Sequence, residues 1–74
     1  MKLVRHYKGG LYVEVARAIE STNERQGREV VVYYSLEKKT WHTRDAIEFD
    51  SVVETPPGAD GLGVRYRFMP IEAA

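Results

Sequence analysis

The sequence predicts an all-β domain, and three observations lead to this fold class. Residues 30–36 form an unbroken run of β-branched and aromatic side chains, the strongest strand signal in the chain. Four other short segments have strand-like patterns and are separated by turn residues. The length of 74 residues allows a single domain, 1–74, with one compact core. These features fit a small five-stranded SH3-like barrel with one short helical turn, whose closure would remove exposed edges; an open antiparallel sheet with one packed helical turn is the alternative.

The segment 30–36 is the predicted central strand because it is apolar on both faces. One face carries Val30, Val32, Tyr34 and Leu36, and the other carries Val31, Tyr33 and Ser35. A strand of this kind belongs inside a sheet, with a neighbour on either side. The pattern leaves open whether the outer apolar face is covered by the chain itself or by a second copy, so a homodimer is one expectation for so small a core.

The first half of the chain is predicted to be a hairpin followed by a short strand. Gly9 and Gly10 close an N-terminal segment and open a half-buried strand over residues 11–19, in which apolar side chains alternate. Residues 21–27 are polar and form an exposed hairpin loop that returns the chain into the central strand. Residues 37–40 form a tight charged connection, and Trp41 begins a short third strand.

The second half is predicted to contain the helical turn and two more strands. The turn covers residues 44–47 with Thr43 as its N-cap, and the fourth strand covers residues 49–54. Residues 56–61 are a loop rich in proline and glycine. The last strand covers residues 62–69 and ends at Pro70, with residues 71–74 as a loose tail. Its inward side chains are Val64, Tyr66 and Phe68, and its outward ones are Arg65 and Arg67.

Composition restricts the location and partners of the protein. Eleven basic and eleven acidic residues give a formal net charge of zero, which argues against a strong nonspecific nucleic-acid binder. There is no cysteine, and no apolar run is long enough for a signal peptide or a membrane span. We therefore expect a cytoplasmic protein that does not associate with membranes.

The opening motif resembles a family of short bacterial proteins that is known only as a domain of unknown function. The resemblance covers nearly the whole chain: H-Y-K-G-x-x-Y begins at His6, V-V-Y begins at Val31, and Trp41, Phe49, Arg67 and Phe68 follow. It implies an SH3-like barrel and no established activity. Two departures stand out. The family has W-x-R where Trp41 and Arg44 are three residues apart, and a histidine that commonly ends the family's second strand corresponds to Glu20.

Catalytic and metal-binding patterns are weak, so we expect neither an enzyme nor a metal or other cofactor. His6 and His42 are far apart and lack the spacing of a metal site. No serine has nucleophile-elbow surroundings, and the glycines after residue 57 lack the remainder of a phosphate-binding loop. Glu48 and Asp50 could share a strand face, where a carboxylate pair would raise the pKa of one member. Exposed edge charges are the simpler explanation for this pair.

Aromatic and basic side chains occur together and predict a binding face. The candidate residues are Tyr7, Lys8, Tyr12, Trp41, Arg44, Arg65 and Arg67. Small barrels bind peptides or single-stranded nucleic acids across faces of this composition. We therefore expect a non-enzymatic binding module for a protein or peptide, with RNA or single-stranded DNA as the alternative ligand. A small hydrolase that uses His6 or His42 with a carboxylate is the third hypothesis. The competing explanation for the three rings is ordinary packing.

Overall fold

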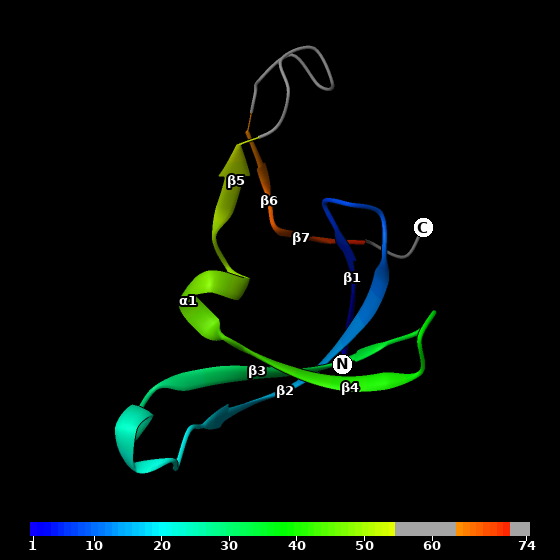
Figure 1. Cartoon of the computed structure of the whole chain (residues 1–74). Coiled ribbons are helices and arrows are strands. Elements are labelled where there is room, and N and C mark those ends of the chain that lie inside the picture. The colour runs from blue at the N-terminus through cyan, green and yellow to red at the C-terminus, as the bar shows by residue number, and fades with distance from the viewer. Residues whose placement is uncertain (55–63, 72–74) are drawn as a thin grey trace.

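The computed structural model describes residues 1–54 and 64–71, and its main element is an open antiparallel sheet (Figure 1). Its five strands lie in the order β4-β3-β2-β1-β7. Their bounds are β1 Lys2–His6, β2 Leu11–Ile19, β3 Glu29–Ser35, β4 Thr40–Asp45 and β7 Phe68–Pro70. A 3-10 turn, Asn23–Arg25, lies in the β2–β3 loop, and a helical turn α1, Ala46–Phe49, follows β4. The short strands β5, Val52–Glu54, and β6, Val64–Tyr66, pair in a separate two-stranded sheet.

The central strand was predicted correctly in its neighbours and within one residue in its bounds; Leu36, predicted as its last residue, lies beyond its end. Strand β3 pairs with β2 on one side and with β4 on the other. Val31, Tyr33 and Ser35 are each at most 4% exposed and lie on what we call the inner face. Val32 and Tyr34 are half-buried on the opposite, outer face. The period-2 alternation therefore separates a fully buried side of this strand from a partly covered one.

The hydrophobic core lies on the inner face, under the helical turn. It consists of Val4, Val31, Tyr33, Ala46, Phe49 and Phe68. The rings of Phe49 and Phe68 stack with centroids 4.1 Å apart and planes 8° from parallel. Both Ala46 and Phe49 come from α1, so four residues of helix close this side of the sheet.

The predicted position of the helical turn was wrong by two residues. Arg44 and Asp45 belong to β4, because this strand stays paired with β3 until Asp45 lies opposite Val30. Asp45 is the N-cap instead of Thr43, and its carboxylate accepts a hydrogen bond of 3.0 Å from the backbone N–H of Ile47. The predicted fourth strand consequently loses its first residues, and Phe49 lies in the helix.

The sheet does not close into a barrel, so the open sheet considered as the alternative is the correct architecture. Strand β1 was not predicted as a strand, and it occupies the free edge of β2. The predicted last strand is divided at Arg67, whose backbone N–H donates to the carbonyl of Ser51 while its own carbonyl accepts from Tyr7. Before this corner β6 pairs with β5, and after it β7 pairs with β1, leaving β4 and β7 as edges of the larger sheet.

The corner also changes which side chains face the core. Phe68 is buried as predicted, but Tyr66, predicted to point inward, is 55% exposed. Arg65 and Arg67, which were predicted to point outward, are half-buried. The predicted loop 56–61, residues 62 and 63 of the predicted last strand, and tail residues 72–74 lie outside the described residues. In the described part of the chain, no helix has the length and apolar character needed to cross a bilayer.

Candidate functional site

The turn between β1 and β2 positions the first side chains of the site. The backbone N–H of His6 donates to the carbonyl of Gly10 at 2.8 Å, and that of Gly9 donates to the carbonyl of His6 at 2.7 Å. Gly9 has φ +106°, a backbone conformation that residues other than glycine rarely adopt. The Lys8 N–H donates to Nδ1 of His6 at 3.2 Å. Nδ1 is thus an acceptor, and the neutral imidazole carries its proton on Nε2.

Gly10 makes room for the Tyr12 ring. A Cβ at Gly10 would lie 3.0 Å from Cε2 and 3.3 Å from the hydroxyl oxygen of Tyr12. The ring packs edge-on against Tyr33 at 5.4 Å and against Phe68 at 5.6 Å. Tyr12 is half-buried and extends the core to the surface of the inner face. Packing therefore accounts for one side of this ring.

Aromatic rings and cationic side chains from β1, β4, β7 and the β1–β2 turn contact one another on the inner face. The His6 ring lies 4.5 Å from Tyr7 and 4.9 Å from Phe68. The ammonium of Lys8 is 5.7 Å from the Tyr7 centroid. The guanidinium carbon of Arg44 is 5.5 Å from the Phe68 centroid, within the range of cation–π contacts.

The charges of this region act together on His6. Partial burial lowers the pKa of His6 below its usual 6.5, and the nearby charges of Arg44, Lys8 and Arg67 lower the pKa further. The ring is therefore neutral at pH 7. Arg44 also pairs with Glu48 at 3.1 Å, and Nε of Arg67 donates to the Ser51 hydroxyl at 3.3 Å.

We name this region the basic aromatic face, formed by His6, Tyr7, Lys8, Tyr12, Arg44 and Arg67. Five of its members are predicted site residues that the structure brings together. The sixth, His6, was considered only as a metal ligand or catalytic base. The signal for its position is the Lys8-Gly9-Gly10 turn that follows, because the Lys8 N–H of that turn bonds the His6 ring.

Two predicted site residues lie elsewhere. Trp41 is on the outer face, where it is 65% exposed and packs against Tyr34 with ring centroids 5.0 Å apart. It reaches that face because it lies opposite Tyr34 in the register, one position from His42 on the inner face. Arg65 lies opposite Val53 in the separate β5–β6 sheet.

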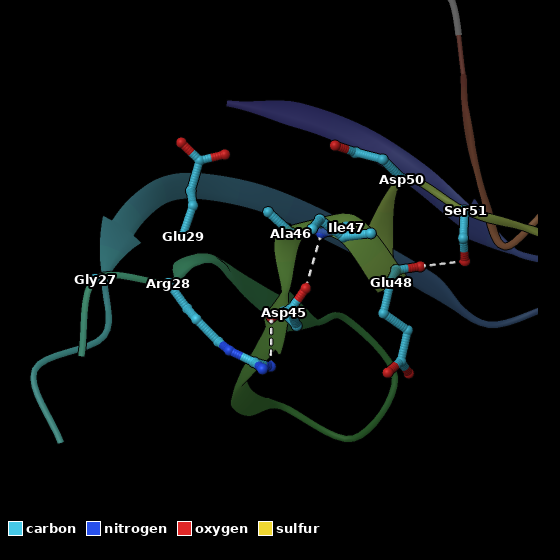
Figure 2. A pocket seen from close by; sticks show the side chains of 9 residues that line it. All are labelled: Gly27, Arg28, Glu29, Asp45, Ala46, Ile47, Glu48, Asp50 and Ser51. Atoms are coloured by element: carbon cyan, nitrogen blue, oxygen red, sulfur yellow. Dashed lines mark hydrogen bonds and ion pairs between the residues drawn. The ribbon is translucent and has the colours of Figure 1, made fainter. Parts of the chain in front are cut away.

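A hollow of about 750 Å³ lies between the start of β3 and α1 (Figure 2). Four carboxylates line it: Glu29, Asp45, Glu48 and Asp50. Each is engaged within the chain. Asp45 caps α1 and lies 3.6 Å from Arg28, Glu48 pairs with Arg44, and Arg17 binds both Asp50 and Glu29. Through these arginines, Asp50 links the end of α1 to β2 and Glu48 links α1 to β4.

The carboxylate pair considered in the sequence does not behave as an acid–base pair. Glu48 lies in α1 and Asp50 is its C-cap, so the two do not share a strand face. Hydrogen bonds from Arg17 lower the pKa of Asp50, which is the opposite of the shift that a general acid needs. Within residues 1–54 and 64–71, no group of three or more histidine, aspartate and glutamate side chains is arranged to hold a metal ion.

Comparison with protein families matches residues 2–70 to the model described as a protein of unknown function, DUF1653. The chain belongs to the DUF1653 family. Searches among curated proteins and among solved structures find no match. The DUF1653 match spans every described strand and α1, so the basic aromatic face lies entirely within the family domain.

Proposed function

We propose that this DUF1653 domain is a non-enzymatic binding module whose basic aromatic face takes an acidic segment of a protein or peptide. The observation that carries the proposal is that Lys8 lies over Tyr7 and Arg44 over Phe68, next to the His6 ring, whose pKa the charges of Arg44, Lys8 and Arg67 lower. The chain as a whole has a formal net charge of zero, so this concentration of positive charge is local. A local cluster of this kind attracts an anionic group without making the whole surface bind anions nonspecifically.

The two arginines supply the recognition geometry. A guanidinium binds a carboxylate through two parallel hydrogen bonds, which fixes the orientation of the ligand as well as its charge. The contact with Phe68 limits the positions of the Arg44 guanidinium. Its present partner, Glu48, is 55% exposed, so an incoming carboxylate can replace it at little cost. Tyr7 offers an adjacent half-buried ring for apolar atoms of the ligand.

Single-stranded nucleic acid is the second candidate, and one observation favours it. The His6 and Tyr7 rings lie side by side at 4.5 Å, next to Lys8, so a base could stack there while its phosphate meets a cation. Stacking on one aromatic ring contributes about 1–3 kcal/mol per base. The balanced total charge supports the peptide as the first candidate.

The deciding experiment is a fluorescence-anisotropy titration with two sets of labelled probes at low and moderate salt. One set is Asp/Glu-rich peptides that contain aromatic residues, and the other is RNA and DNA single strands. We expect the peptides to bind, and Lys8→Glu and Arg44→Glu each to weaken binding about tenfold or more by reversing one charge. Lys38→Glu is the matched control, because Lys38 is an exposed lysine in the β3–β4 turn and should leave binding unchanged.

The salt series separates the two candidates. Oligonucleotide binding that falls steeply with salt, without peptide binding, would replace the peptide by nucleic acid, since counterion release scales with phosphate contacts. Absence of binding to both sets at low salt would refute the proposed face. Equal losses in Lys8→Glu and Lys38→Glu would show that only general charge matters.

A further inference from the structure

The outer face of the sheet carries a straight row of apolar side chains across four strands. The register places Leu3 opposite Val13, Val13 opposite Tyr34, and Tyr34 opposite Trp41. Cross-strand neighbours in one row project on the same side of a sheet. The row therefore runs without interruption from β1 to the edge strand β4.

Two shorter rows flank it and are almost uncharged. On one side Met69 and Leu11 lie next to Arg5, and on the other Ala16, Val32 and Thr43 lie in register. We name the apolar members the outer patch: Leu3, Leu11, Val13, Val32, Tyr34, Trp41 and Met69. Within it, Trp41 is 65%, Met69 47% and Leu3 37% exposed. Arg5 is the one charged residue of the three rows.

We propose that a second copy of this chain covers the outer patch, with the two sheets packed face to face around a two-fold axis. Five strands about 4.8 Å apart and three rows of side chains about 7 Å apart give a patch on the order of 400 Å² in projection. Two copies together bury about 800 Å² in projection, and the accessible surface of protruding side chains such as Trp41 exceeds their projection, which brings the total near the roughly 1,000 Å² of a specific interface.

The composition of the outer patch favours a second copy over a transient partner. Interfaces between identical subunits are more apolar than transient ones, and their centres are rich in Trp, Tyr and Met and poor in charge. Among the described residues, the buried core and α1 both lie on the inner face, so the large sheet is covered by a helix on that side only. An apolar sheet face is normally buried against another element, and a second sheet packed face to face would bury the outer patch in this way.

Symmetry supports the same occupant. A two-fold interface uses the same patch on both partners, so a flat and nearly uncharged surface is complementary to itself without any matching of charges. The basic aromatic face lies on the other side of the sheet, so dimer formation leaves it open in both copies. The dimer would then present two such faces to a partner.

The chain contains its own reporter, because Trp41 is the only tryptophan and lies in the patch. We expect sedimentation equilibrium to give twice the 8.5 kDa mass of one chain at micromolar concentration. On dilution the mass should fall, and the emission of Trp41 should shift to longer wavelength as its indole becomes solvated. A single-chain mass with constant emission over about a thousandfold range of concentration would overturn the proposal.

Substitutions locate the interface. Leu3→Glu keeps the reporter and should raise the dissociation constant of the dimer at least about tenfold, since it places two charges in the interface by symmetry. Trp41→Lys, at the most exposed patch position, should do the same without disturbing the monomer. Ile47→Glu is the matched control, because Ile47 is 83% exposed but belongs to α1. Far-UV circular dichroism verifies folding, and a Trp41→Lys protein that is folded and still dimeric would refute this interface.

Discussion

The two faces of the five-stranded sheet are built from the same strands but differ in what covers them. On the inner face Tyr33 contacts the rings of Tyr12, His42, Phe49 and Phe68, all with centroids 5.3–5.4 Å away. On the outer face its neighbour Tyr34 has one ring partner among the described residues, Trp41. Both tyrosines belong to the same apolar run. Strand propensity therefore forms β3, but the helical turn and β7 decide which face becomes the core.

The largest expected difference between the two faces comes from truncating Phe68, on the inner face, and its neighbour Met69, on the outer face. Phe68 is 6% exposed and Met69 is 47% exposed, although they are adjacent in β7. We expect Phe68→Ala to lower the free energy of unfolding by about 3–5 kcal/mol, since it deletes a buried ring and leaves a cavity. That loss is comparable to the total stability of many small domains.

Urea denaturation at low protein concentration measures the difference. Under these conditions Met69→Ala should cost less than about 1 kcal/mol, because a half-exposed side chain loses little contact. Equal losses in the free energy of unfolding for the two substitutions would mean that both faces contribute equally to the stability of the monomer. A cost for Met69→Ala that grows with protein concentration would instead locate Met69 in the dimer interface.

A smaller effect is expected from the ion-pair network that fixes α1 over the inner face. Nη2 of Arg17 lies 2.8 Å from Asp50 and 3.0 Å from Glu14, and its Nη1 lies 3.4 Å from Glu29. Glu14 is only 13% exposed, so loss of Arg17 leaves a poorly solvated carboxylate near two others, with only the more distant Lys2, at 4.0 Å, as its cation among the described residues. We expect Arg17→Met to cost about 1–2 kcal/mol in chemical denaturation, after allowance for the 37% exposure of Arg17 itself.

Arg28 provides the matched control for Arg17. It is 67% exposed and lies 3.6 Å from Asp45, so Arg28→Met should change stability by less than about 0.5 kcal/mol. The pH dependence also identifies the network. Hydrogen bonds from Arg17 lower the pKa of Asp50. The contribution of the Arg17–Asp50 pair to the free energy of unfolding is therefore fully present above pH 3.8, the ordinary pKa, and is lost as the pH falls through the lowered pKa. A free energy of unfolding of the wild-type protein that does not fall with pH below 3.8 would contradict this role.

The sequence predicted the strands with clear alternation and missed the elements that depend on tertiary contacts. The limits of β2 and the place of β3 follow from apolar periodicity. Strand β1 is only five residues long, and its two apolar residues, Leu3 and Val4, are adjacent, so it lacks the apolar-polar alternation of a half-buried strand. The corner at Arg67 could not be inferred from the sequence, because it is set by hydrogen bonds to residues 51 and 7.

The candidate site was predicted in composition but not in arrangement. Residue type identified cations and rings, and the turn at Gly9 explains why Tyr7, Lys8 and Tyr12 stay together. Whether Trp41 joins them depends on the face it occupies, and that depends on the start of β4. One residue of register reverses every side chain of a strand. The register with β3, not the motif, places Trp41 on the outer face.

The smallest expected effect concerns His6, the point where the core and the basic aromatic face meet. Its pKa is lowered in the folded state, so the unfolded chain binds the proton more readily. Stability should therefore be constant well above pH 6.5 and should fall as the pH drops from 6.5 toward the lowered pKa, by at most about 1.4 kcal/mol per pH unit. His6→Gln should remove that slope in a series of urea titrations across this range.

Binding of an acidic ligand should raise the pKa of His6, whereas folding lowers it. Arg44, Lys8 and Arg67 disfavour the imidazolium, and a bound carboxylate would neutralise part of that field. An acidic peptide should therefore raise the pKa of His6, which an NMR titration of the ring protons measures directly. By linkage the peptide should bind more tightly as His6 gains its proton, until the peptide carboxylates themselves protonate. An unchanged His6 pKa in the presence of saturating peptide would place the ligand away from this face.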